Sequence, residues 1–208
     1  QNAIAQHGRD GAYQMVTFSG DVFMHDDELA WAAAALFVAT GDPAYDAALR
    51  SQVPDPNDQS LRRWSWWSMF GGYGCAFRDY AFAVRSGRLS AAQLDGSYLA
   101  KCEAEIRRAA TNVIKWSDKS AYGTSFIEES KSSRLAGWYF SGEWTFDPAV
   151  AYALDPRPQY LDVILKNYNY EMGCNPVNVT YLTGLGWRRQ REIVHQYALN
   201  DAHVLPPN

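Results

Sequence analysis

Residues 26–45 read DDELAWAAAALFVATGDPAY, and this stretch decides the fold class. It opens on Asp26 and Asp27, whose carboxylates suit the start of a helix because they cap it and complement its dipole. The alanine-rich middle has high helix propensity, and the Thr-Gly-Asp-Pro run at 40–43 ends it. Residues 29–39 are apolar nearly all round, which predicts a helix that is buried on most sides.

The rest of the chain repeats the helical signal with little strand-like alternation. Further helices are predicted at about 75–86, at 90–117 with a break near Gly96, from Glu143 to Leu154, and in the segment before Gly173. A polar break covers 51–60. The amphipathic face of the 90–117 helix carries Leu94, Tyr98, Ile106, Ala110 and Val113. The pattern predicts an all-α layout of antiparallel helical hairpins.

Composition limits the classes of protein that fit. The 208 residues are 47% hydrophobic and 20% charged, which fits one globular domain or part of a larger one. The net charge of −4 leaves no basic surface for nucleic acid. No apolar run reaches the roughly 18 residues of a membrane-spanning helix. We therefore expect neither nucleic acid nor membrane as a partner.

The chain start and the cysteines give weaker signals. The opening QNAIAQHGRD shows no signal peptide and no initiator Met, so we expect a processed chain or a piece of a longer one. Cys75, Cys102 and Cys174 lack metal-ligand spacing and are interpreted as buried small hydrophobic residues, with one disulfide as the open alternative. No metal or cofactor is predicted.

Aromatic residues gather between the predicted helices. They make up 14% of the chain, including 8 Trp and 13 Tyr, and with glycine they concentrate in four segments: 64–74, 122–126, 138–144 and 173–197. Flat apolar faces with a hydrogen-bonding edge suit a cleft that stacks on sugar rings, while a core rich in large side chains is the alternative. Residues 170–197, YEMGCNPVNVTYLTGLGWRRQREIVHQY, are too rich in Gly, Asn and Pro for a regular helix and are interpreted as a cleft-forming loop.

Several motifs in order carry a resemblance to a known family. HDDELAWAAAALFVATGDPAY resembles the Y-x-DEL-x-WAA…ATGD helix of glycoside hydrolase family 9, the cellulases and related β-glycanases. NYNYEMGCNPVNVTYLTGLGWRR resembles that family's Y-x-LG-x-NP-x-N-x-SYV-x-GFG segment. Between them, WSWWSMFGGYGCAFRDYAFA is similar to its W-D-D…YG…LLA stretch, and the loop at 122–144 takes the place of a further cleft loop that carries a Trp. The resemblance covers nearly the whole chain.

The resemblance implies an (α/α)6 barrel, a toroid of six helical hairpins with a substrate cleft at one end. The five or six helices predicted here are about half of that number, so residues 1–208 are interpreted as a single domain that is an incomplete part of such a barrel. In the family, the pair of carboxylates that serves as the catalytic base lies in a DAGD-type motif, which this sequence lacks. The Glu that serves as the general acid lies beyond the last matched segment. No catalytic residue is therefore assigned within the chain.

The substrate-binding candidates rest on the matched motifs. Trp66 matches the Trp of W-D-D, with Trp67 where the first Asp would stand, and Trp144 matches the Trp of the other loop; packing in the core is the alternative for these tryptophans. In the last segment the candidates are Tyr181, Trp187, Arg188, Arg191 and His195. His195 matches one His of the family's HHR run, and the Arg of that run is missing in either alignment, so Arg191 or Arg188 is the substitute cation.

The function implied by the resemblance is an inverting glycosidase of β-linked glycans, cellulose-like or related oligosaccharides. This chain would supply the aromatic cleft, and the rest of its own catalytic domain would be a partner. An extracellular or periplasmic location is expected. Two alternatives stay open: a non-catalytic carbohydrate-binding remnant, and another sugar-processing helical toroid enzyme, a lyase or an epimerase.

Overall fold

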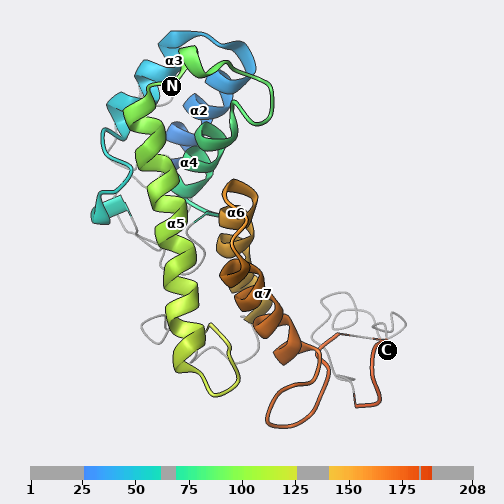
Figure 1. Cartoon of the computed structure of the whole chain (residues 1–208). Coiled ribbons are helices and arrows are strands. Elements are labelled where there is room, and N and C mark those ends of the chain that lie inside the picture. The colour runs from blue at the N-terminus through green and yellow to red at the C-terminus, as the bar shows by residue number, and fades with distance from the viewer. Residues whose placement is uncertain (1–25, 62–68, 126–140, 183, 189–208) are drawn as a thin grey trace, which may run out of the picture. The chain divides into compact units, whose positions relative to one another are not determined.

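The structure is a computed structural model, which describes residues 26–61, 69–125, 141–182 and 184–188. These residues form six α-helices and three short 3-10 helices, and no strand occurs among them, so the predicted all-α class is confirmed (Figure 1). The chain divides into two compact units whose boundary falls on the longest helix, after Ile106. Each unit is described by itself.

The helices follow the chain in a simple order. They are α2 (Asp26–Thr40), α3 (Pro43–Gln52), η2 (Gln59–Leu61), α4 (Tyr73–Phe82), η3 (Ala91–Gln93), α5 (Gly96–Lys119), η5 (Ser141–Thr145), α6 (Phe146–Leu154) and α7 (Pro158–Glu171). The break predicted near Gly96 separates η3 from α5. The predicted helices at 26–45, 75–86, 90–117 and 143–154, and the one before Gly173, correspond to α2, α4, α5, α6 and α7.

In the first unit, α2 packs against both α3 and α4. The turn between α2 and α3 is tight: Gly41 has φ +71°, a conformation that side-chain-bearing residues rarely adopt. The Asp42 carboxylate accepts a hydrogen bond of 2.9 Å from the Ala44 N–H, and Pro43 stands at the start of α3. The Gly-Asp-Pro run thus ends one helix and begins the next, and α3 is a helix that the sequence reading missed.

Aromatic stacking forms the centre of the first unit. The Phe37 and Tyr80 rings stack with centroids 6.0 Å apart, and Tyr98 meets Tyr80 edge-on at 5.0 Å. All three rings are buried, and they come from α2, α4 and α5, so this contact joins three helices. Such offset and edge-to-face pairs add to the burial of apolar area.

Helix α2 is buried on one face, not on most sides. Its inward positions include Ala30, Ala34 and Phe37, whereas Trp31 and Leu36 are each 43% exposed. The expectation of burial on most sides is therefore wrong for the described residues. The reason is that α3 and α4 cover one side of an apolar helix and nothing described covers the other.

The second unit contains the end of α5, η5, α6 and α7. Helix α7 packs on α6 and η5, and the core combines Val113 and Trp116 of α5 with Trp144 and Val163. The buried Asn167 amide on α7 accepts a 2.9 Å bond from the Ser125 N–H and donates to Ser125 Oγ, also 2.9 Å. The segment that follows α5 is therefore fixed to α7.

Cys75 and Cys102 are buried, as interpreted from the sequence, but Cys174 is exposed, and all three are free thiols. Burial raises the pKa of the Cys102 thiol, so it is held in the protonated form. Of the helices in the described ranges, none combines the length and the apolar character needed to cross a bilayer.

Candidate functional site

The candidate site is the segment that follows α7 in the second unit, residues 173–188 as far as the structure describes them. Helix α7 ends at Glu171, and Gly173, which follows the C-cap residue Met172, takes φ +116°. The chain then turns back on the helix end: the Tyr181 N–H donates to the Glu171 carbonyl at 2.8 Å, and the Thr180 hydroxyl donates to the Met172 carbonyl at 3.3 Å.

A second contact closes the segment on itself. The Thr180 N–H donates to the Arg188 carbonyl at 2.7 Å, and Gly186 lies against the Thr180 side chain. A Cβ at position 186 would lie 2.6 Å from Thr180 Oγ1, and Gly186 has φ +78°. Only glycine meets both the conformation and the close approach, so glycine is required at position 186.

Tyr181 belongs to a group of three tyrosines. The Tyr170 ring lies 6.2 Å from that of Tyr181 and 6.0 Å from that of Tyr122, in tilted and edge-on arrangements. Burial, followed by the proximity of Tyr181, raises the pKa of Tyr170, so its hydroxyl stays protonated and can donate a hydrogen bond. Tyr122 is exposed. The three tyrosines combine apolar faces with hydroxyl groups, the chemistry of a saccharide contact.

Two glutamates lie beside this group. Glu171 Oε1 accepts a hydrogen bond of 2.5 Å from the Gly142 N–H, and a Cβ at 142 would collide with that carboxylate at 2.9 Å. Burial, and then the charge of Glu171, raises the pKa of Glu143. A carboxyl group with a raised pKa can hold a proton at mildly acidic pH and either donate to or accept from a hydroxyl.

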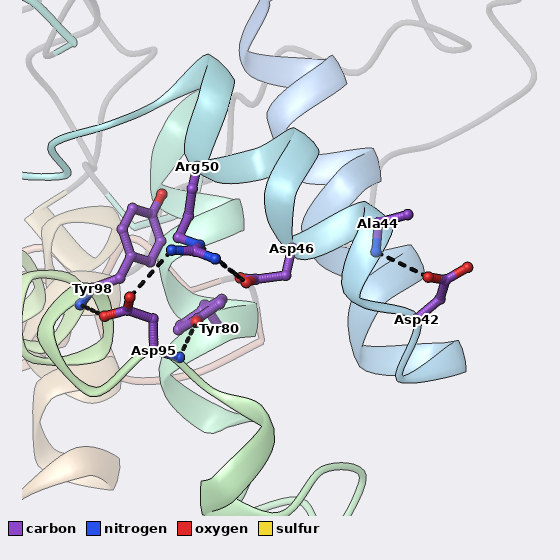
Figure 2. Close-up of polar contacts among 7 residues, drawn as sticks. All are labelled: Asp42, Ala44, Asp46, Arg50, Tyr80, Asp95 and Tyr98. Carbon is purple, nitrogen blue, oxygen red and sulfur yellow. Dashed lines mark hydrogen bonds and ion pairs between the residues drawn. The ribbon is translucent and has the colours of Figure 1, made fainter.

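In the first unit, Asp46 and Asp95 form an acidic cluster around Arg50 (Figure 2). Arg50 bonds Asp46 at 2.8 and 3.0 Å and Asp95 at 3.1 Å, and the Asp95 N–H donates to the Tyr80 hydroxyl at 2.9 Å. The bond with Asp46 raises the pKa of Arg50, and the bond from the Tyr98 N–H lowers the pKa of Asp95. One guanidinium contacts both carboxylates, so the cluster joins α3 to the start of α5.

The predicted site residues fall into three groups. Trp187 is 101% exposed, Arg188 is exposed and Tyr181 is half-buried, and all three lie on the same loop. Trp144 is 1% exposed in the core cluster of the second unit, the position that the core-packing alternative describes. The other four candidates, Trp66, Trp67, Arg191 and His195, lie outside the described residues.

Sequence reasoning missed Tyr122, Tyr170 and Glu171. The available signal was the NYNYEMG run, which places a Tyr and a Glu on the last turn of a helix that ends in glycine. Across the described ranges, no group of three or more His, Cys, Asp or Glu side chains has metal-binding geometry. The arrangement is suited to hydrogen bonding and stacking.

The comparison with protein families decides the relationship. The family model of glycosyl hydrolase family 9 matches residues 1–205. The chain belongs to glycosyl hydrolase family 9. Among the curated proteins, a xyloglucan-specific endo-beta-1,4-glucanase of Bacteroides ovatus is 22% identical over 180 residues, which are 85% of this chain and 28% of that protein.

Solved structures of family 9 agree in fold. The endoglucanase J30 superposes with a TM-score of 0.68 at 20% identity, over 95% of this chain and 35% of the other. A Bacteroides ovatus family 9 structure gives a TM-score of 0.63 at 23% identity, over 100% of this chain and 35% of the other. The helices are thus part of the (α/α)6 barrel of family 9. The chain spans about a third or less of the length of these relatives.

Proposed function

We propose that this chain is part of the catalytic domain of an inverting glycosidase of β-linked glycans, and that its 173–197 segment forms one wall of the substrate cleft. Family 9 membership supports a β-glucan hydrolase of the cellulase or xyloglucanase type. A β-1,4-linked glucan, with or without branches, is therefore the substrate class that we propose.

The observation that carries the proposal is the exposure of Trp187 on a loop that is braced against α7. A fully exposed Trp is unusual, because a large apolar face in water is unfavourable unless a ligand or partner covers it. Here the indole lies next to Arg188 and on the same loop as Tyr181. The indole would stack on a sugar ring, while the guanidinium and the phenol would donate hydrogen bonds to its hydroxyls.

The remaining candidates keep proposed roles in the same wall. Arg191 and His195 would add hydrogen bonds to sugar hydroxyls, and Trp66 and Trp67 would add stacking faces. Inversion requires a general acid and a general base about 6.5–9.5 Å apart, with room for water between the base and the sugar. We place both carboxylates in the rest of the family 9 domain, because the sequence lacks the motifs that would carry them.

The rest of the domain is also a proposed partner. The chain covers 28% and 35% of its relatives, and α7 carries an exposed apolar stripe at the helical spacing of four, three and four residues: Leu161, Leu165, Tyr168 and Met172. Such a stripe is normally covered by another helix. We therefore propose that α7 packs against a further helix of the barrel.

We also propose that the whole enzyme works outside the cytoplasm, in the medium or the periplasm, because its polymer substrate occurs there.

The test is hydrolysis of a soluble β-1,4-glucan by the product of the whole reading frame, followed by proton NMR of the new reducing ends. The proposal predicts reducing sugar that first appears as the α-anomer. Initial β-anomer would contradict inversion. Binding without hydrolysis would favour the carbohydrate-binding remnant, and an unsaturated or epimerised product would show the lyase or epimerase alternative.

A further inference from the structure

A single buried amide joins the two sides of the segment that carries Tyr181 and Trp187. Asn175 is 3% exposed. Its Nδ2 donates to the Tyr170 carbonyl at 2.8 Å and to the Val179 carbonyl at 2.7 Å. One of these carbonyls belongs to α7 and the other to the returning loop, so the side chain bridges them.

The other end of the same amide faces backbone donors. Asn175 Oδ1 accepts from the Val177 N–H at 3.3 Å and from the Val179 N–H at 3.2 Å. The two donors of the amide thus face two carbonyls, and its acceptor faces two N–H groups. Only a carboxamide supplies both kinds of group in this geometry, since a carboxylate has no donor and an aliphatic side chain has neither.

The residues next to this bridge include those to which saccharide contacts are assigned in the proposed function. Val179, which Asn175 bonds through both N–H and C=O, precedes Thr180 and Tyr181. Thr180 in turn bonds the Arg188 carbonyl, and Tyr181 bonds the Glu171 carbonyl. The position of the exposed Trp187, one residue before Arg188, therefore depends on a backbone path that begins at Asn175.

We propose that Asn175 is the positioning residue of the saccharide-binding wall: its amide fixes the 173–188 loop before a glycan arrives, with Tyr181 and Trp187 already in place. The inference rests on the proposed function and names a residue that acts through others. A loop ordered in advance loses less conformational entropy on binding, so the glycan binds more tightly than it would to a mobile loop.

The test compares two substitutions of the same chemistry in the product of the whole reading frame. Asn175→Asp keeps the size and the acceptors but replaces both donors with a charged oxygen that faces two carbonyls. The control is Asn178→Asp, in the same loop, where the side chain is exposed and φ is +50°, a conformation that Asp tolerates. A second control, Val163→Ala in the core of the same unit, destabilises the fold without touching the loop.

Two measurements are made on each protein: hydrogen exchange of the Thr180 and Tyr181 amides by NMR, and the Kd for a β-1,4-linked glucose tetrasaccharide. Asn175→Asp is expected to speed both exchange rates at least tenfold, to weaken the Kd at least tenfold, and to remove the shift of the Trp187 indole signal on titration. Neither control should weaken the Kd more than twofold, although Val163→Ala lowers the melting temperature.

Unchanged exchange in Asn175→Asp overturns the inference, and so does faster exchange with an unchanged Kd. A loss of affinity in Val163→Ala equal to that in Asn175→Asp also overturns it, because general destabilisation would then explain both. Failure of the unsubstituted chain to bind the tetrasaccharide contradicts the proposed function itself and overturns the positioning role with it. That result is recognised without any variant.

Discussion

Replacing Gly186 by alanine tests whether packing against Thr180 requires glycine at position 186. The new Cβ would lie 2.6 Å from Thr180 Oγ1, at a residue with φ +78°. The left-handed conformation costs alanine roughly 1–2 kcal/mol. The Thr180 hydroxyl must also move, which breaks its bond to the Met172 carbonyl at about 0.5–1.5 kcal/mol. We expect a local destabilisation of about 2–3 kcal/mol.

Hydrogen exchange of the Thr180 amide measures this change, since that N–H bonds the Arg188 carbonyl only in the closed loop. About 2–3 kcal/mol corresponds to roughly 30- to 150-fold faster exchange. Two controls separate the contributions. Gly87 has φ +71°, and a Cβ added there would meet nothing within 4 Å, so Gly87→Ala shows the conformational cost alone.

The second control repeats Gly186→Ala in a Thr180→Ala chain, which removes the hydroxyl. There the substitution should cost only the conformational part, and the difference between the two backgrounds is the coupling between the two residues. Exchange of the Thr180 amide at the unsubstituted rate in Gly186→Ala, or equal costs in both backgrounds, would refute the close packing of Gly186 on Thr180.

Three further substitutions test other parts of the account. Trp144→Ala should lower the free energy of unfolding by about 3–5 kcal/mol in urea titrations because its indole is buried in the core of the second unit; a loss below about 1 kcal/mol would contradict this packing. Asp95 has a lowered pKa, so its ionised form stabilises the fold at pH values above the usual pKa of 3.8. This contribution is lost as the pH falls through the folded-state pKa. Asp95→Asn should therefore make the free energy of unfolding depend less on pH in the acid range, and an unchanged dependence would count against the network. Glu143 has a pKa raised above the usual 4.5, so its ionised form destabilises the fold once the pH rises above the folded-state pKa. Glu143→Gln should therefore raise the melting temperature at pH 7 but not below pH 4.5. Equal changes in melting temperature at both pH values would contradict the raised pKa of Glu143.

The fold was predictable where one periodic pattern of apolar residues extended over a whole segment. The 90–117 region carries apolar residues at helical spacing, and its predicted face, including Tyr98, Ile106 and Val113, is buried as expected. Helix α3 was not predicted because Gly-Asp-Pro can both end one helix and begin the next. The same residues end α2 and supply the Asp cap and first-turn Pro of α3. The sequence pattern was interpreted only as the end of a helix.

The degree of burial was less predictable than the helices. Residues 29–39 are apolar all round, yet Trp31 and Leu36 remain exposed. An apolar sequence shows that a helix can be covered, whereas the coverage itself depends on which neighbours are present. The same limit applies to Trp144, since a Trp that matches a cleft motif and a Trp that packs in the core look alike in sequence.

The candidate site shows the same division. Glycine, asparagine and proline at 173–186 predicted an irregular loop, and Gly173, Gly184 and Gly186 there have positive φ. The bridge made by Asn175 depends on residues before and after it, so the bonds themselves could not be read from Asn-Pro alone. The tyrosine group is a long-range contact, because Tyr122 of the segment after α5 meets Tyr170 near the end of α7.

The central claim is that the loop after α7 contacts saccharide, and its most direct test is a titration of the isotope-labelled chain with a β-1,4-linked glucose tetrasaccharide, followed by NMR of the indole N–H signals. The account predicts that the Trp187 signal shifts and saturates with the sugar while those of the buried Trp116 and Trp144 stay in place. A saturating shift at other tryptophans with none at Trp187 would contradict it.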